Sequence, residues 1–170
     1  MTTEPFRREQ CRVAAAMAAA LLTALALLGF AFARAGASVP FADRLQATLR
    51  ADLFVLLCLA AAIGDVARRR FFSVQDIAAA GPASPAVAAA RSMLQNTLEQ
   101  SVLAIGAHLA LTAAFDRSAV PVAVLVGLFV AGRVMFYGGY RHGAGARAFG
   151  FALTFYPSVL ALVAALALAF

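Results

Sequence analysis

The chain alternates between long apolar stretches and short polar connections from one end to the other. An α-helix rises about 1.5 Å per residue, so about 20 mostly apolar residues span the hydrocarbon core of a bilayer. Five stretches meet that length and predict transmembrane helices over residues 12–34, 47–67, 92–115, 119–140 and 148–169. The sequence therefore predicts an all-α integral membrane protein without a separate soluble domain.

Two connections indicate how these helices follow one another. Only residues 116–118 separate the third and fourth stretches, which predicts an antiparallel hairpin. The long connection, residues 68–91, starts with three arginines and two phenylalanines and continues through glycine and proline. We interpret its start as a cytoplasmic basic stop followed by an aromatic anchor at the membrane surface. Pro157 lies inside the last stretch and predicts a bend there.

Composition agrees with a membrane protein and argues against a soluble or nucleic-acid-binding one. Hydrophobic residues make up 64% of the chain and charged residues only 13%, and a soluble domain does not bury that much apolar surface. All 14 basic residues are arginines, and they lie at the ends of apolar stretches rather than in one basic stripe. We therefore expect no nucleic-acid partner. Cys11 and Cys58 are too few for a disulfide framework or a metal site.

The arginines also predict the orientation. With the N-terminus inside, nine arginines lie on the cytoplasmic side and four outside, while Arg133 lies within a helix. Arginine favours the cytoplasmic side, so we expect a cytoplasmic N-terminus and an outside C-terminus, in what we expect to be a bacterial inner membrane. The first stretch could instead be a signal peptide. Its apolar run, residues 13–33, exceeds the usual length of roughly 7–15 residues and favours an uncleaved helix.

Polar residues in the third and fourth stretches gather toward the cytoplasmic ends. Asn96 and Glu99 are three residues apart and share a helix face. Arg133, Tyr137 and Tyr140 follow at intervals of four and three and share another face. Glu99 and Arg133 come to the same depth in antiparallel neighbours. We expect them to form an ion pair, because a lone charge is costly inside a membrane.

Arg91 and Arg147 stand at the mouth of this cluster, so the predicted pocket holds more arginine than carboxylate. Arginine binds carboxylates through two parallel hydrogen bonds, and the pocket therefore suits a small, multiply charged anion. Two alternatives are that these residues only hold helices together or that they belong to a transport path. Transport ranks last, because the outer halves of the third and fifth stretches have few polar residues apart from His108. We expect His108 to satisfy a neighbouring polar group rather than bind a metal.

At these residues the chain resembles the MAPEG superfamily, the membrane-associated proteins of eicosanoid and glutathione metabolism. Three pieces within residues 51–170 carry the resemblance: Arg91-Ser-Met-Leu-Gln-Asn96-Thr-Leu-Glu99, Arg133-Val-Met-Phe-Tyr137-Gly-Gly-Tyr140 and Arg147-Ala-Phe-Gly. The resemblance implies a four-helix transmembrane domain over residues 47–170. Residues 1–46 would then contain an N-terminal tail, one additional transmembrane helix and a connecting loop.

The resemblance also implies a glutathione transferase or peroxidase that forms a homotrimer and takes a hydrophobic electrophile or lipid hydroperoxide from the membrane. Arg147 would stabilise the thiolate of glutathione, because a nearby guanidinium lowers the pKa of a thiol. The rest of the tripeptide would be held by Arg91, Asn96, Glu99, Arg133, Tyr137 and Tyr140. Ser92 replaces an arginine of many members, and Phe136 replaces a tyrosine of the leukotriene-forming branch. The alternative is therefore a non-catalytic lipid-binding or scaffold protein.

Overall fold

The computed structural model describes residues 3–79 and 81–170. These residues form α1 (Thr3–Ala33), α2 (Phe41–Phe71), α3 (Val74–Ile77), α4 (Pro85–Ala114), α5 (Ala119–Gly139), the 3₁₀ turn η1 (Tyr140–His142) and α6 (Ala144–Ala169). The five long helices confirm the five predicted ones, and four of them begin earlier than predicted. The predicted long connection contains the short helix α3, and α6 continues through Pro157.

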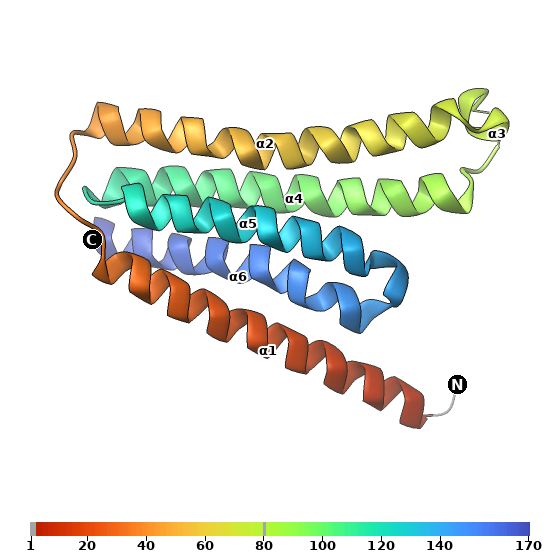
Figure 1. Ribbon diagram of the computed structural model, residues 1–170, viewed down its shortest axis with the longest axis horizontal. Coiled ribbons are helices and arrows are strands. Elements are labelled where there is room, and N and C mark those ends of the chain that lie inside the picture. The colour runs from red at the N-terminus through yellow and green to blue at the C-terminus, as the bar shows by residue number, and fades with distance from the viewer. Residues whose placement is uncertain (1–2, 80) are drawn as a thin grey trace.

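The long helices lie side by side and alternate in direction (Figure 1). α1 begins at the end of the bundle that carries α3 and η1, which we call the η1 end. α6 ends at the opposite end, beside the loop between α1 and α2. An odd number of passes places the two termini at opposite ends, as the sequence predicts. Which end faces the cytoplasm stays a prediction.

Length and apolar composition qualify four of the described helices to cross a membrane: α1 from Glu4, α2, α5 with η1, and α6. α4 has 30 residues, and several polar side chains lie on its inward face. Those side chains are buried in the bundle, at Thr97, Gln100, Ser101, His108 and Thr112. They lower the hydropathy of α4 without facing lipid, so its role as the fifth span stays a prediction that its length supports.

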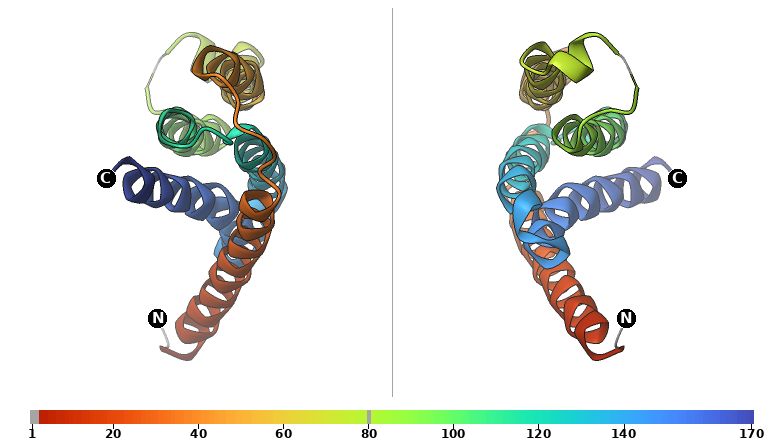
Figure 2. Two further views of the ribbon diagram at one scale, coloured as in Figure 1. Left: turned by 90° about the vertical axis from the view of Figure 1, so that its left-hand side faces the viewer. Right: turned by 90° about the vertical axis from the view of Figure 1, so that its right-hand side faces the viewer.

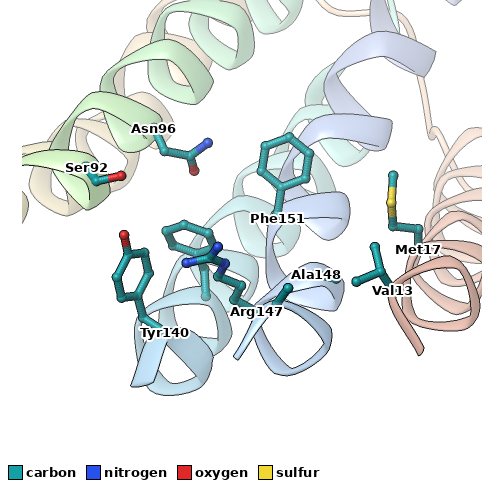
Figure 3. Close-up of a pocket in the computed structure, with 10 residues that line it drawn as sticks. Val13, Met17, Ser92, Asn96, Tyr140, Arg147, Ala148 and Phe151 are labelled. Carbon is teal, nitrogen blue, oxygen red and sulfur yellow. The ribbon is translucent and has the colours of Figure 1, made fainter. Parts of the chain in front are cut away.

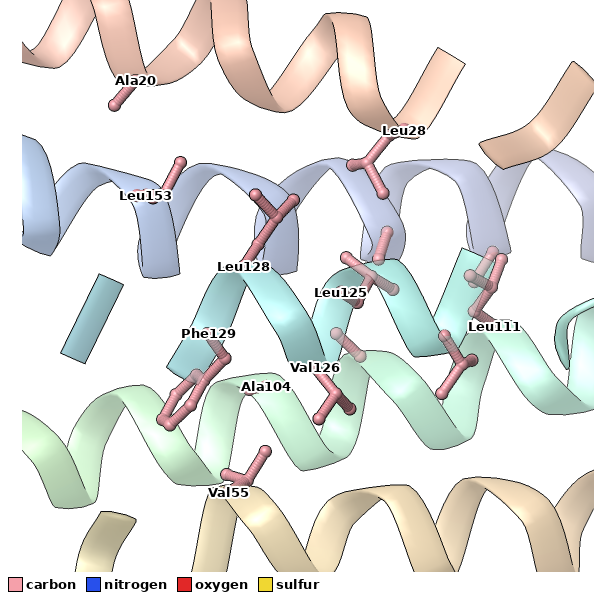
Figure 4. Close-up of a cluster of buried hydrophobic side chains, with 14 of the residues drawn as sticks. Ala20, Leu28, Val55, Ala104, Leu111, Leu125, Val126, Leu128, Phe129 and Leu153 are labelled. Carbon is pink, nitrogen blue, oxygen red and sulfur yellow. The ribbon is translucent and has the colours of Figure 1, made fainter. Parts of the chain in front are cut away.

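α1 packs mainly against α6 and also against α5. Its contact face carries small side chains, and Ala20, Ala24 and Ala31 are each 0% exposed. Figure 4 shows Ala20 and Leu28 of α1 on the side of the bundle where Leu153 of α6 lies. Small residues let membrane helices approach closely, so α1 is joined to the bundle along much of its length. Figure 2 shows that α1 crosses α6 rather than running parallel to it.

α5 and α6 approach each other more closely still, at Gly132 and Gly150. A Cβ atom built on Gly132 would lie 2.9 Å from the carbonyl oxygen of Gly150, and one on Gly150 would lie 2.7 Å from that of Gly132. Neither position has room for a side chain. This contact brings the residue after Gly132, which is Arg133, beside α6.

Polar side chains join α2 to α4 on the far side of the core from the η1 end. The hydroxyl oxygens of Thr48 and Thr112 are 2.7 Å apart, and Nδ1 of His108 is 2.6 Å from Oδ1 of Asp52. All four residues are buried. The expectation that His108 satisfies a neighbouring polar group is confirmed. Val55 and Ala104, both 0% exposed, follow one turn closer to the η1 end and interrupt this polar row.

Candidate functional site

Arg133 is the buried centre of the polar cluster at the η1 end. It is 1% exposed; its Nη1 donates to Oδ1 of Asn96 at 2.8 Å and its Nη2 to Oγ1 of Thr154 at 2.6 Å. Its guanidinium carbon also lies 4.7 Å from the ring centre of Phe136, within the range of a cation–π contact. Arg133 therefore ties α4, α5 and α6 together, while its Nε has no hydrogen-bond partner among the described residues.

The predicted ion pair between Glu99 and Arg133 is wrong within the described chain. Glu99 is exposed, and its Oε1 accepts a 2.9 Å hydrogen bond from Nε2 of Gln95. Successive helical residues are turned by about 100°, and the buried face of α4 is centred near Thr97. Asn96 lies at the edge of that face, and Glu99 lies a further 60° or so beyond the edge. The amide therefore takes the place beside Arg133 that the carboxylate was expected to fill.

Arg147 lies in the first turns of α6 and lines a cavity of about 360 Å³ between four helices. We call it the first cavity; its lining residues are Val13, Met17, Ser92, Asn96, Phe136, Tyr140, Ala144, Arg147, Ala148 and Phe151. The guanidinium carbon of Arg147 is 4.9 Å from the ring centre of Tyr140. In Figure 3 the guanidinium lies between the polar side chains of α4 and η1 and the apolar side chains of α6 and α1.

The turn before Arg147 depends on a glycine and on a distant carboxylate. Gly143 has a φ of 97°, a conformation that glycine adopts without strain, and it starts α6 immediately after η1. The amide nitrogen of Gly145 then donates a 2.8 Å hydrogen bond to Oε1 of Glu9 on α1. A carboxylate favours the N-terminus of a helix. Glu9 therefore joins α1 to the start of the helix that carries Arg147.

Tyr137 lines a second cavity, of about 430 Å³, on the other side of Tyr140. The residues around this second cavity are Ala61, Asp65, Arg69, Ala89, Met93, Tyr137, Tyr140 and Arg141. The hydroxyl of Tyr137 is 3.2 Å from that of Thr97, and Asp65 pairs with Arg69 at 2.7 Å. Tyr140 borders both cavities, whereas Arg147 borders only the first of the two.

Arg91 lies away from both of these cavities. It is exposed and lines a small pocket of about 70 Å³ near α3, together with Arg70 and Gln75. The loop there is held by Asp76, whose carboxylate accepts from Oγ of Ser73 at 2.6 Å and from the amide of Ser84 at 2.9 Å. These hydrogen bonds hold the pKa of Asp76 below its ordinary value.

Four of the seven predicted site residues thus come together: Asn96, Arg133, Tyr140 and Arg147. Tyr137 is close by in the second cavity, while Arg91 and Glu99 lie outside the first. Sequence reasoning missed Thr154 and the α1 residues Val13 and Met17. Thr154 could have been found, because it lies seven residues after Arg147 and so on the same face of α6. No signal in the sequence points to α1 as a wall of the cavity.

The arrangement is a cationic site at the border between polar and apolar linings. Arg147 can stabilise a negative charge, and the cavity places that charge next to Phe151 and Met17.

A family comparison bears on what such a site does: the model of the MAPEG family matches residues 13–167. The chain belongs to the MAPEG family. No curated protein and no solved structure matches it.

Membership in the MAPEG family and the apolar helices together make this an integral membrane protein related in general to glutathione and eicosanoid metabolism. The match is longer than residues 51–170, which carry the three motifs. It begins within α1 and includes the loop that follows. The division into residues 1–46 and a four-helix domain over 47–170 stays a prediction.

Proposed function

We propose that this MAPEG protein is a glutathione-dependent transferase or peroxidase for hydrophobic electrophiles or lipid hydroperoxides. In this proposal Arg147 stabilises the glutathione thiolate in the first cavity. The position of Arg147 carries the proposal, since its guanidinium lies inside a cavity that is polar on one side and apolar on the other. A guanidinium favours the ionised sulfur and raises the thiolate fraction at neutral pH.

The polar side of the first cavity suits a charged tripeptide. The oxygen of the Asn96 amide accepts from Arg133, which leaves the amide nitrogen as the donor for a ligand carboxylate. Ser92 and Tyr140 add hydroxyl groups, and Arg147 adds a positive charge. Arg133 fixes Asn96 from behind and acts as a positioning residue. Tyr137 borders the second cavity, and its ring and that of Tyr140 both contact the ring of Phe136.

The residues of the chain have the same task in both reactions, which is to hold negative charge on sulfur before it attacks. In a transfer, the thiol proton goes to water, the sulfur forms a bond to carbon, and the leaving group departs with the bonding electron pair. In a peroxide reduction, the sulfur attacks one peroxide oxygen and the other leaves as an alkoxide, which takes a proton. The sulfenic acid then reacts with a second glutathione to give the disulfide and water.

A homotrimer is part of the proposal, and the position of Glu99 supports an oligomer. Glu99 is exposed near the middle of α4, and a carboxylate facing hydrocarbon is costly. A second copy that covers this face would remove the exposure and could add Glu99 to the site of its neighbour. Closed symmetric assemblies are the usual form of homo-oligomers.

One observation favours the alternative of a non-catalytic lipid-binding or scaffold protein. Arg91 and Glu99, two of the expected glutathione contacts, lie outside the first cavity, and Ser92 lines it at a position where the resemblance implies an arginine. Glutathione would then have fewer charged contacts than the sequence suggests. Saturable lipid binding without any thiolate signal would support this alternative.

The test is the ultraviolet absorbance of bound thiolate after adding glutathione to the purified protein at neutral pH. We expect a stoichiometric signal that Arg147→Ala abolishes, because the charge that stabilises the thiolate is gone. Arg117→Ala is the matched control, since it removes the same charge from an exposed position in the loop between α4 and α5, which lies at the opposite end of the bundle. Equal signals in Arg147→Ala and the unmodified protein would exclude the role of Arg147.

A further inference from the structure

The first cavity has two unlike halves. Ser92, Asn96 and Tyr140 form one half, while Phe151, Met17 and Val13 form the other (Figure 3). A charged tripeptide gains hydrogen bonds only in the polar half. An uncharged apolar compound is favoured in the other half, where it leaves water or lipid without burying polar groups.

α1 supplies two of the three side chains of the apolar half, and it is held firmly on both sides of them. Glu9, four residues before Val13, accepts the hydrogen bond from Gly145. Ala20, three residues after Met17, is 0% exposed in the contact with the bundle. These four residues follow the spacing of one helix face. The wall formed by Val13 and Met17 therefore has a defined position relative to Arg147.

The second cavity is a poorer place for the same compound. Its wall includes Asp65, Arg69 and Arg141, and Arg147 does not border it. A molecule bound there would be separated from the sulfur by the ring of Tyr140. In the first cavity the apolar half is adjacent to the guanidinium, so a bound electrophile and a thiolate would meet without further movement.

We infer that α1 forms the selectivity wall for the hydrophobic co-substrate, which binds between α1 and α6 against Met17, Val13 and Phe151. The inference rests on the proposed function. The occupant is an uncharged electrophile that carries an aromatic ring, because Phe151 offers a ring face and the Met17 sulfur makes favourable contacts with aromatic rings. In the reaction, the thiolate sulfur bonds to a ring carbon and a halide leaves with the bonding electrons.

The test compares two electrophiles of the same chemistry and different size, 1-chloro-2,4-dinitrobenzene and 1-chloro-2,4-dinitronaphthalene, with the full-length protein in nanodiscs. Met17→Ala should raise the ratio of kcat/KM for the larger compound to kcat/KM for the smaller one by about tenfold. Met17→Phe should lower the same ratio by about as much. The addition or loss of one group in an apolar pocket changes the preference between two substrates to that extent. The thiolate signal should stay unchanged in both variants. Equilibrium dialysis of unreactive 1,3-dinitronaphthalene without glutathione should show the same change in affinity.

Two variants make the outcome specific. Ala18→Phe adds a ring next to Met17 but on an exposed face of α1, and it should leave the ratio unchanged. Ala61→Phe narrows the second cavity and should also leave the ratio of kcat/KM unchanged. A changed ratio in Ala61→Phe would overturn the inference. So would an unchanged ratio in both Met17 variants. A folded protein without any thiolate signal would overturn the proposed function first. An unchanged ratio beside an intact thiolate signal would overturn only the role of α1.

Discussion

Arg133 on α5 and Thr154 on α6 are joined by a 2.6 Å hydrogen bond from Nη2 to Oγ1, in a place where the arginine is 1% exposed. The same guanidinium bonds to Asn96 on α4. One buried charge therefore sets the relative positions of three helices just behind the first cavity. The cost of burying that charge is offset only while its partners remain.

Thr154→Val should destabilise the protein by about 2 kcal/mol, because it removes the acceptor of a buried charged donor and keeps the shape of the side chain. The measurement is the free energy of unfolding by detergent titration. Thr23→Val is the control, since the Thr23 hydroxyl donates to the carbonyl of Ala19 in its own helix and joins no other helix in the described part of the chain. Equal losses in the two variants would contradict the structural role of the Arg133–Thr154 bond.

Gly150→Ala should destabilise the protein by about 1–3 kcal/mol, because the added methyl group would meet the backbone of Gly132 and Phe136. The shift would also move Arg133 away from Thr154. Gly127→Ala on α5 is the matched control, since no described atom of a neighbouring helix lies within 4 Å of the added Cβ atom. It should be neutral or should stabilise the helix by up to about 1 kcal/mol. A stable Gly150→Ala variant would mean that α5 and α6 are further apart than described.

Asp52→Ala should destabilise the contact between α2 and α4 by about 2 kcal/mol, because it leaves the buried ring of His108 without its partner. Asp52→Asn should cost less, since its amide oxygen can still accept a hydrogen bond from the imidazole. Asp43→Ala, on the exposed first turn of the same helix, should cost less than about 1 kcal/mol. The same unfolding titration ranks the three variants, and a different order would contradict the pairing.

Glu99→Leu should distinguish a covered from a lipid-facing carboxylate. If a second copy covers Glu99, the leucine leaves the partner's polar groups unsatisfied, and we expect a smaller oligomer by native mass spectrometry. If Glu99 faces lipid, the substitution replaces a costly charge and should stabilise the protein. Leu98→Ala, an exposed neighbour, controls for loss of apolar contact. An oligomer of unchanged size with increased stability would exclude Glu99 from the interface.

The loop around α3 should open at acid pH. Hydrogen bonds from Ser73 and Ser84 lower the pKa of Asp76 in the folded chain, so the ionised form stabilises the loop. That stabilisation is complete above the unfolded pKa, near pH 4, and is lost as the pH falls through the lower folded value. Hydrogen–deuterium exchange of residues 73–84, corrected for its intrinsic pH dependence, measures the opening. Asp76→Asn should show weak protection already at neutral pH, and protection unchanged by that substitution would exclude Asp76 as the anchor.

Hydropathy alone was sufficient to predict the five long helices, because a bilayer admits only segments that satisfy their own backbone hydrogen bonds. The spacing of polar residues also predicted that Asn96, Arg133, Tyr140 and Arg147 gather at one end. These conclusions need only the rise of the helix and the order of the segments. They do not depend on how each helix is turned about its axis.

The tertiary structure decided everything that depends on that rotation and on contacts between distant segments. Asn96 and Glu99 are one turn apart, yet packing of Thr97 into the bundle turns the amide toward Arg133 and the carboxylate outward. Packing also places Met17 of α1 in the same cavity as Arg147, 130 residues later in the chain. A hydrophobic helix can present any of its apolar faces to a neighbour, so the sequence pattern of α1 does not specify which one it presents. The close fit of small side chains against α6 makes that choice.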